Sequence, residues 1–128
     1  MEKLIISTSK APAALGPYSQ AVKVGNLLYT SGQLPINAAT GEFLNSDIKK
    51  ATTQSLDNVK VVLEAAGTTL DKVVKTLVFL KDMNDFAEMN EVYSQYFTEN
   101  PPARSCVQVA KLPKDALIEI EVIAIIAE

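Results

Sequence analysis

The last apolar segment of the chain, Leu117 to Ile126, has bulky aliphatic side chains on both faces of the strand that it predicts. Successive side chains of a strand point to opposite faces, so Ile118 and Ile120 share one face, while Ile123 and Ile125 share the other with two glutamates. Burying one large aliphatic side chain is worth about 1.5–3 kcal/mol. The segment therefore predicts a strand in a sheet that needs cover on both faces.

A longer segment upstream predicts a helix that can cover one of these faces. Ser46 or Asp47 can cap its N-terminus, and Gly67 follows its last apolar residue, where helices commonly end. The residues at helical spacing are Ile48, Thr52, Leu56, Val59, Leu63 and Ala66. Such spacing is typical of an amphipathic helix with one buried stripe.

A second helix is predicted after Asp85, because Asp85 and Glu88 have the spacing of a capping box. Asn100-Pro101-Pro102 ends it, since proline cannot continue a helix. Its apolar stripe is Phe86, Met89, Tyr93 and the pair Tyr96 and Phe97.

Five further segments are rich in β-branched or aromatic residues and bounded by turn residues, which is typical of strands. They are Lys3 to Ser7, Ser19 to Val24, Leu27 to Ser31, Val73 to Lys81 and Arg104 to Ala110. Gly25-Asn26 predicts a two-residue hairpin turn between the second and the third. The order of elements is therefore β-β-β-α-β-α-β-β.

This order predicts one α+β domain over residues 1–128, in which both helices pack on the same face of a mixed sheet. No third helix remains for the other face. We therefore expect a homo-oligomer whose subunits bury the second face of the sheet. The alternative is a monomer whose small sheet curls on itself.

Composition and charge argue against several classes of protein. The net charge is −3 and Arg104 is the only arginine, whereas proteins that bind nucleic acid gather basic residues on one face. The longest apolar stretch, Ala116 to Ala127, is too short for a bilayer, and Leu4-Ile5-Ile6 is too short for a secretory signal. The single cysteine, Cys106, suits a reducing compartment. We expect a soluble cytoplasmic protein that binds neither nucleic acid nor membrane.

Histidine is absent, so any catalysis must use other groups, and Arg104 and Glu119 are the first candidates. Period two places Arg104, Cys106 and Gln108 on one face of their strand. If this strand pairs antiparallel with the next, Arg104 or Cys106 faces Glu119 across the ladder. The pair predicts either a structural ion pair at a subunit interface, or a guanidinium that binds a substrate carboxylate beside a carboxylate that handles a proton or a water.

Cys106 and two turns are weaker candidates. Without a histidine to activate it, Cys106 is more typical of a packing residue than of a nucleophile. Gly32 in Ser31-Gly32-Gln33 lets the backbone approach a ligand, and Gly16-Pro17-Tyr18-Ser19 presents a phenol, although both sequences are also ordinary turns. The sequence has no phosphate-binding loop and no cluster of metal ligands, so we expect no cofactor and no metal.

Several segments are more informative together than any one is alone. They are Gly16-Pro17-Tyr18-Ser19-Gln20, Ser31 to Pro35 (SGQLP), Thr76 to Asp85 (TLVFLKDMND), Pro102 to Val107 (PARSCV), Leu112 to Asp115 (LPKD) and Ile118 to Ala124 (IEIEVIA). In this order they resemble the Rid family of reactive intermediate deaminases, also called YjgF-like proteins. The resemblance covers essentially the whole chain, and the presence of Arg104 places it nearest the archetypal enamine/imine deaminase branch.

The resemblance implies a chorismate-mutase-like fold assembled as a homotrimer with three clefts between subunits. It also implies hydrolysis of 2-imino acids and their enamine tautomers, such as 2-iminobutanoate, 2-iminopropanoate and 2-aminoacrylate, to 2-oxo acids and ammonia. Amino-acid dehydratases release these reactive compounds. By position, Arg104 matches the family's carboxylate-binding arginine and Glu119 the acid that handles water. The residues that match the lining of the cleft are Tyr18, Ser31, Gly32 and Cys106.

The chain departs from the family's pattern in two places. Gln108 stands where relatives often carry an acid, and the loop before Pro101 is short.

The chemistry of these residues suggests a mechanism. Arg104, with backbone N–H groups around Ser105-Cys106, holds the substrate carboxylate. Glu119 orients a water and moves its proton to the departing nitrogen, which Ser31 or nearby carbonyl groups hold.

Two other functions use the same chain differently. A ligand-sensing protein would bind 2-oxo acids or a partner protein through Arg104 without turnover. An endoribonuclease, an activity attributed to some Rid-like proteins, would need charge stabilisation and proton transfer at a phosphate ester. The acidic net charge, the single arginine and the absence of histidine weigh against the second alternative.

Overall fold

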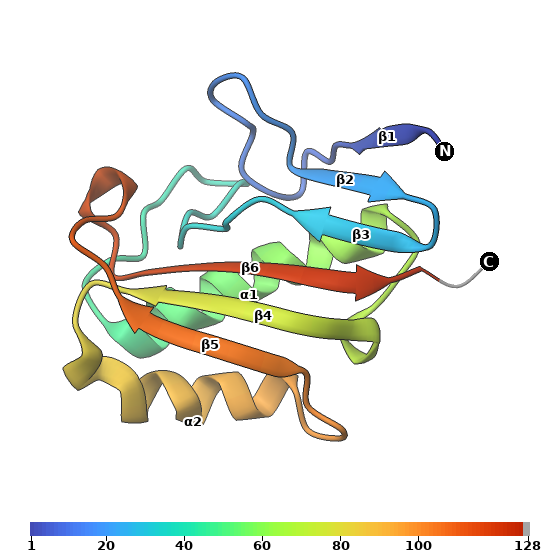
Figure 1. Ribbon diagram of the computed structural model, residues 1–128. Coiled ribbons are helices and arrows are strands. Elements are labelled where there is room, and N and C mark those ends of the chain that lie inside the picture. The colour runs from blue at the N-terminus through green and yellow to red at the C-terminus, as the bar shows by residue number, and fades with distance from the viewer. Residues whose placement is uncertain (127–128) are drawn as a thin grey trace.

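A computed structural model describes residues 1–126 of the chain and contains one six-stranded sheet in the order β1-β2-β3-β6-β4-β5 (Figure 1). The strands are β1 (Lys3–Ile6), β2 (Ala21–Val24), β3 (Leu27–Thr30), β4 (Val73–Leu80), β5 (Ala103–Gln108) and β6 (Ile118–Ile125). Neighbouring strands are antiparallel except β4 and β5, which run parallel. The prediction of a mixed sheet is confirmed.

Two helices, α1 (Ile48–Ala65) and α2 (Phe86–Tyr96), cover one face of this sheet, and Figure 1 shows both on the same side of the strands. Leu56 and Leu63 of α1 and Ile120 of β6 are fully buried in the core between helix and sheet. The predicted α+β order, with both helices on one face, is confirmed. Within residues 1–126, neither helix is long and apolar enough to cross a membrane.

The two ends of α1 have the chemistry that the sequence predicts. Asp47 is the N-cap, because its carboxylate accepts hydrogen bonds from the backbone N–H of Lys49 at 2.7 Å and of Lys50 at 3.4 Å. At the other end Gly67 has a φ of +86°, a conformation that costs glycine little. The N–H of Gly67 donates to Glu64 and that of Thr68 donates to Leu63, which closes the helix with a Schellman motif.

The start of α2 differs from the prediction. Asp85 makes no capping hydrogen bond with its side chain. The chain instead passes through a short 3₁₀ turn, Met83–Asp85, whose cap is Asp82, with the Asn84 N–H donating to its carboxylate at 2.8 Å. The cap therefore lies one turn earlier than expected, because the 3₁₀ turn leads directly into the helix.

The neighbours of β5 also differ from the arrangement considered for Arg104 and Glu119. β5 pairs with β4, in the register Thr76↔Arg104, and β4 separates it from β6. The α2 crossover between β4 and β5 returns the chain parallel to β4, and β6 then pairs antiparallel with the opposite edge of β4, in the register Phe79↔Glu119. Arg104 and Glu119 consequently do not face each other across a ladder.

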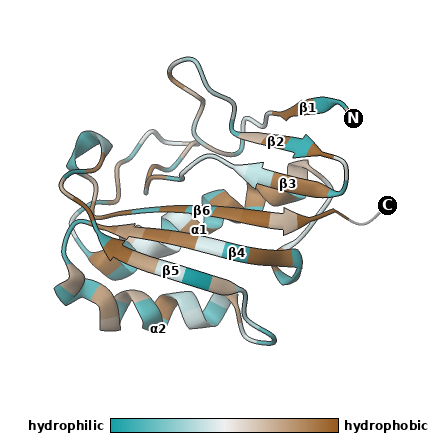
Figure 2. Cartoon of the chain, in the orientation of Figure 1, coloured by the Kyte–Doolittle hydropathy of each residue, from teal (hydrophilic) through white to brown (hydrophobic). Residues whose placement is uncertain are grey.

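Within residues 1–126, no helix lies on the second face of the sheet, as the sequence predicts. Ile5, Tyr29, Val107 and Ile125 point to this face by register, and each is at least 40% exposed. Figure 2 shows that much of the sheet is hydrophobic. Large apolar side chains left in water on one face favour association with another surface.

The cap of α1 gives a direct test of this fold. Asp47→Ala removes both hydrogen bonds to the first turn, so we expect it to lower the free energy of unfolding by about 1 kcal/mol. Urea unfolding measures the change. Ser46→Ala is the matched control, because its side chain makes no capping bond to α1, and we expect no significant loss there. Equal losses in the two variants would contradict the assignment of the cap.

Candidate active site

A cleft of about 1140 Å³ opens at the end of the sheet where β3 finishes and β6 begins. Three irregular stretches of chain line it: the loop between β1 and β2, the segment after β3 and the turn before β6. Of the residues proposed from the sequence, Tyr18, Ser31, Gly32 and Glu119 line this cleft. The structure therefore brings four of them together.

The carboxyl group of Glu119 lies directly against the backbone of Gly32. A Cβ atom placed on Gly32 would lie 2.5 Å from Cδ of Glu119, closer than real Cβ atoms approach other atoms. Backbone hydrogen bonds between Gln33 and Ile120, at 2.8 and 3.2 Å, hold the two segments side by side. A side chain at position 32 would displace the carboxyl group of Glu119, so glycine lets the acid keep this position.

Glu119 is half-buried, and its electrostatic surroundings favour the protonated form. Burial raises the pKa of its carboxyl group, and the like charge of Glu121, two residues along the strand, raises it further. A carboxyl group with a raised pKa accepts and releases protons more readily near neutral pH than an exposed glutamate does. Its position and its proton affinity both suit an acid–base group.

Ser31 and Tyr18 are fixed by their own hydrogen bonds. The Ser31 hydroxyl donates to the carbonyl of Ser19 at 2.6 Å, and the Ser31 N–H donates to the carbonyl of Gln20 at 2.9 Å. The hydroxyl oxygen of Ser31 can still accept a hydrogen bond from a ligand. Tyr18 is 53% exposed, and its hydroxyl accepts a long hydrogen bond of 3.4 Å from the N–H of Leu15.

Arg104 lies elsewhere, on the side of the sheet that faces α2. Its Nη1 donates to Oδ1 of Asn90 at 2.6 Å, and its guanidinium carbon lies 4.7 Å from the ring centre of Tyr93 and 5.4 Å from that of Phe86. Within residues 1–126, no carboxylate lies within ion-pair distance of Arg104. The guanidinium is thus held in place by neutral groups, and its charge stays available to an anion.

Cys106 and Ser105 follow Arg104 along β5 and point to opposite faces. Cys106 is a partly buried free thiol that packs against the core, and burial raises its pKa while Arg104 lowers it to a lesser extent. Ser105 is exposed, and its hydroxyl accepts a hydrogen bond of 3.2 Å from Lys75. A thiol with a raised pKa is a poor nucleophile, which fits a packing role for Cys106.

Arg104 and Glu119 are therefore too far apart to serve one small ligand within a single subunit. Glu119 pairs with Phe79 and Arg104 with Thr76, so they differ by three residues along β4 and by two strand spacings across the sheet. These offsets correspond to about 10 Å in each direction. The two side chains also point to opposite faces, because Thr76 and Phe79 do.

Sequence reasoning missed Asn90, which orients Arg104 from α2. Phe86, Asn90 and Tyr93 stand at positions i, i+4 and i+7 of the helix, so they share the face that meets the guanidinium. This spacing is the signal that could have identified Asn90. Among the described residues, no group of three or more acidic, cysteine or histidine side chains could hold a metal ion.

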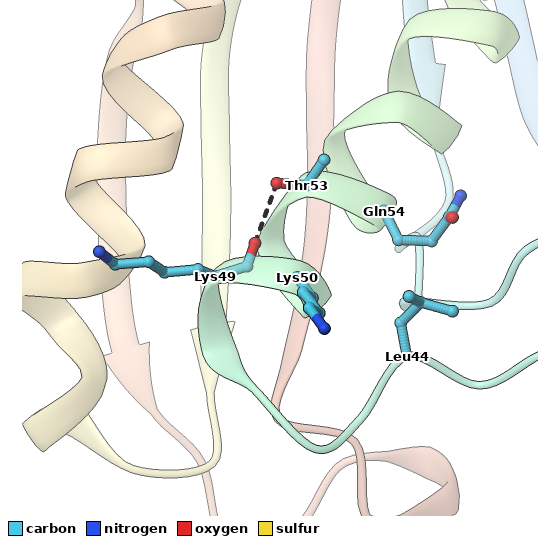
Figure 3. A pocket seen from close by; sticks show the side chains of 5 residues that line it. All are labelled: Leu44, Lys49, Lys50, Thr53 and Gln54. Carbon is cyan, nitrogen blue, oxygen red and sulfur yellow. Dashed lines mark hydrogen bonds between the residues drawn. The ribbon is translucent and has the colours of Figure 1, made fainter.

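A smaller hollow beside the first turn of α1 has none of the candidate residues. Figure 3 shows its lining, which is Leu44, Lys49, Lys50, Thr53 and Gln54. Lys49 is paired with Glu91 at 2.7 Å, and the Thr53 hydroxyl donates to the Lys49 carbonyl at 2.9 Å. Because this hollow holds none of the candidate residues, and Lys49 and Thr53 are already engaged by other groups of the chain, the cleft at Glu119 is the better candidate site.

The chain is a two-helix, six-stranded α+β domain with a half-buried carboxyl group in a cleft, and these features define the class of protein with which it is compared. A family model described as endoribonuclease L-PSP matches residues 8–126. A RutC family protein of Pyrococcus abyssi is 56% identical over 124 residues, covering 97% of this chain and 98% of that protein. The chain therefore belongs to this family, the Rid or YjgF-like proteins that its motifs resemble.

Two further relatives connect the family with small metabolites. The 2-iminobutanoate/2-iminopropanoate deaminase of Escherichia coli (strain K12) is 55% identical over 123 residues, covering 94% of this chain and 95% of that protein. The crystal structure of E. coli TdcF with bound serine has a TM-score of 0.92 and 48% identity, covering 97% of this chain and 99% of that one. The deaminase name supports an enamine/imine deaminase role at the level of the family.

Because the pKa of Glu119 is raised, the free energy of unfolding should depend on the ionisation of this group. The folded protein holds this proton more tightly than the unfolded chain does, so ionisation of Glu119 destabilises the fold. We expect Glu119→Gln to be more stable than the original protein above the folded-state pKa. The difference should vanish as the pH falls below the ordinary value of 4.5, where the carboxyl group is protonated in both states.

Urea unfolding of both proteins across this pH range measures the difference. Glu121→Gln is a useful companion, because it removes the like charge and should bring the pKa of Glu119 closer to its ordinary value. A Glu119→Gln protein that is no more stable near neutral pH would contradict the assigned cost of ionisation.

Proposed function

We propose that this protein is a cytoplasmic enamine/imine deaminase that hydrolyses 2-iminobutanoate and 2-iminopropanoate to 2-oxo acids and ammonia. The observation that carries the proposal is the half-buried carboxyl group of Glu119, held against Gly32 in the cleft with a raised pKa. The name of the E. coli deaminase and the serine bound to TdcF, a small molecule with a carboxylate and a nitrogen on adjacent carbons, both support it.

The proposal requires a site shared between copies of the chain. Arg104 and Glu119 point to opposite faces of one subunit, and the second face of the sheet has no helix on it. We therefore propose a homotrimer in which packing of the open faces brings Arg104 of one subunit to the cleft of its neighbour. This arrangement would bury the apolar face and complete the site at the same time.

In this site β5 would anchor the substrate. The guanidinium of Arg104 binds the substrate carboxylate with two parallel hydrogen bonds. β5 is an edge strand, so some of its backbone N–H groups, including those near Ser105 and Cys106, face away from the ladder. These groups can donate further hydrogen bonds to the substrate carboxylate. The position of the carboxylate then fixes that of the adjacent C=N carbon.

The acid–base step falls to Glu119. Its carboxylate takes a proton from a water as the water oxygen bonds to the C=N carbon, and the resulting carboxyl group gives a proton to the nitrogen. Glu119 then takes the proton of the new hydroxyl group and gives it to the nitrogen, so the tetrahedral adduct collapses to the 2-oxo acid as the C–N bond breaks and ammonia leaves. Ser31 or nearby backbone carbonyl groups hold the nitrogen, and Tyr18 closes the rim of the cleft. No covalent bond to the protein is needed, so Cys106 remains a thiol.

Turnover tests these roles directly. A threonine/serine dehydratase generates the imines in situ, and formation of 2-oxo acid is followed with and without the protein. We expect the original chain to accelerate imine hydrolysis. Arg104→Ala should lose this activity because the carboxylate anchor is gone, whereas Cys106→Ala should keep most of it because the thiol only packs. A fully active Arg104→Ala protein would refute the anchoring role.

Mixing of inactive variants tests whether the site is shared. Arg104→Ala and Glu119→Gln are unfolded together in equal amounts and refolded. If each site takes Arg104 from one subunit and Glu119 from another, about a quarter of the sites regain both groups. If both groups came from one subunit, no mixed site would be complete and the activity would stay at the level of the separate variants.

A binding protein without turnover remains the main alternative, because the same Arg104 and cleft would hold a 2-oxo acid. Binding of 2-oxobutanoate without any acceleration of imine hydrolysis would favour it. The description of the family model names an endoribonuclease. The net charge of −3 and the single arginine of this chain weigh against it, because phosphate contacts need clustered positive charge.

A further inference from the structure

The side chain of Gln20 holds the loop between β1 and β2, which forms one wall of the cleft. It is 5% exposed, and its Oε1 accepts a hydrogen bond of 2.7 Å from the N–H of Thr8. Its Nε2 donates to the carbonyls of Thr8 at 3.0 Å, Pro12 at 2.8 Å and Ala11 at 3.3 Å. One buried amide thus satisfies backbone groups at both ends of a five-residue segment.

The loop between β1 and β2, which Figure 1 shows as a long excursion from the sheet, is held by this amide. Within residues 1–126, every hydrogen bond from residues 7–14 to a residue beyond that stretch is made with the Gln20 side chain. From this segment, the core cluster of the described residues includes the small side chain of Ala11, which is 2% exposed. A loop with so few ties is mobile once its buried partner is lost.

The backbone of Gln20 also contacts the segment after β3, which lines the same cleft. The backbone carbonyl of Gln20 accepts the N–H of Ser31 at 2.9 Å, so Gln20 connects the wall with the turn that carries Gly32. Residues of the loop, including Leu15, line the same cleft as Glu119. From this arrangement we propose that Gln20 is a positioning residue for substrate binding, a role that rests on the proposed function of the cleft.

The geometry separates binding from chemistry. Glu119 is held by the backbone bonds between Gln33 and Ile120, which do not involve the loop. Loss of the Gln20 side chain therefore loosens the wall but leaves the acid and its support in place. A substrate must then order the loop when it binds, and this cost weakens binding of the ground state and of the transition state by the same amount. KM therefore rises, whereas kcat does not fall.

Gln20→Met tests the proposal, because methionine has a similar length and can make none of the four hydrogen bonds. We expect KM for the imine to rise about tenfold while kcat stays within about twofold. Thr68→Val is the matched control, since it removes one buried hydrogen bond of 2.7 Å to the carbonyl of Ile125, near the end of β6 away from Glu119. It should lower the melting temperature and leave KM unchanged. An unchanged KM in Gln20→Met, or an equal rise in Thr68→Val, would overturn the proposal.

Amide hydrogen exchange keeps this test separate from the question of activity. In Gln20→Met the amide of Thr8 should exchange much faster, while the amides of α1 keep their protection. Gln20→Glu keeps the acceptor for Thr8 but places a carboxylate against the carbonyls of Thr8, Ala11 and Pro12, so the Thr8 amide should exchange at least as fast as in Gln20→Met. Absence of turnover in the original chain would count against the deaminase alone, whereas unchanged exchange at Thr8 in Gln20→Met would count against the role of Gln20.

Discussion

The antiparallel pair β4–β6 is the element on which the rest of the structure depends. One face of this pair packs against α1 through side chains such as Val78 and Ile120, which are fully buried. The opposite face carries Leu77, Phe79 and Glu119 and has no helix over it. Because the same two strands set both faces, the core and the candidate site are fixed by one hydrogen-bonded register.

This register also explains why the site residues form two groups. β6 brings Glu119 to the end of β3, where Gly32 leaves room for the carboxyl group. β5 lies on the other edge of β4 and directs Arg104 towards Asn90 of α2. A sheet with one open face and a charged group at its edge can complete such a site by association, which links the apolar surface to the proposed chemistry.

Much of this architecture could be predicted from the sequence, because local signals determine it. The helical spacing from Ile48, the cap at Asp47 and the glycine at position 67 located α1, and the Gly25-Asn26 pair located a hairpin. The strand order could not be predicted in the same way, since local patterns do not say that β4 lies between β5 and β6. Helical spacing could have placed Asn90 on the same face as Phe86 and Tyr93, but it does not say that this face meets Arg104. The role of Gln20 depends on contacts with a separate segment, so it emerges only in the folded chain.

In the proposed trimer one small carboxylate is bound by Arg104 of one subunit and faced by Glu119 of another. A crystal structure of the protein with 2-oxobutanoate, the proposed product, tests this most directly. We expect the carboxylate on Arg104 of one subunit, with the carbonyl carbon facing Glu119 of its neighbour across the cleft. A ligand bound wholly within one subunit, or away from both residues, would contradict it.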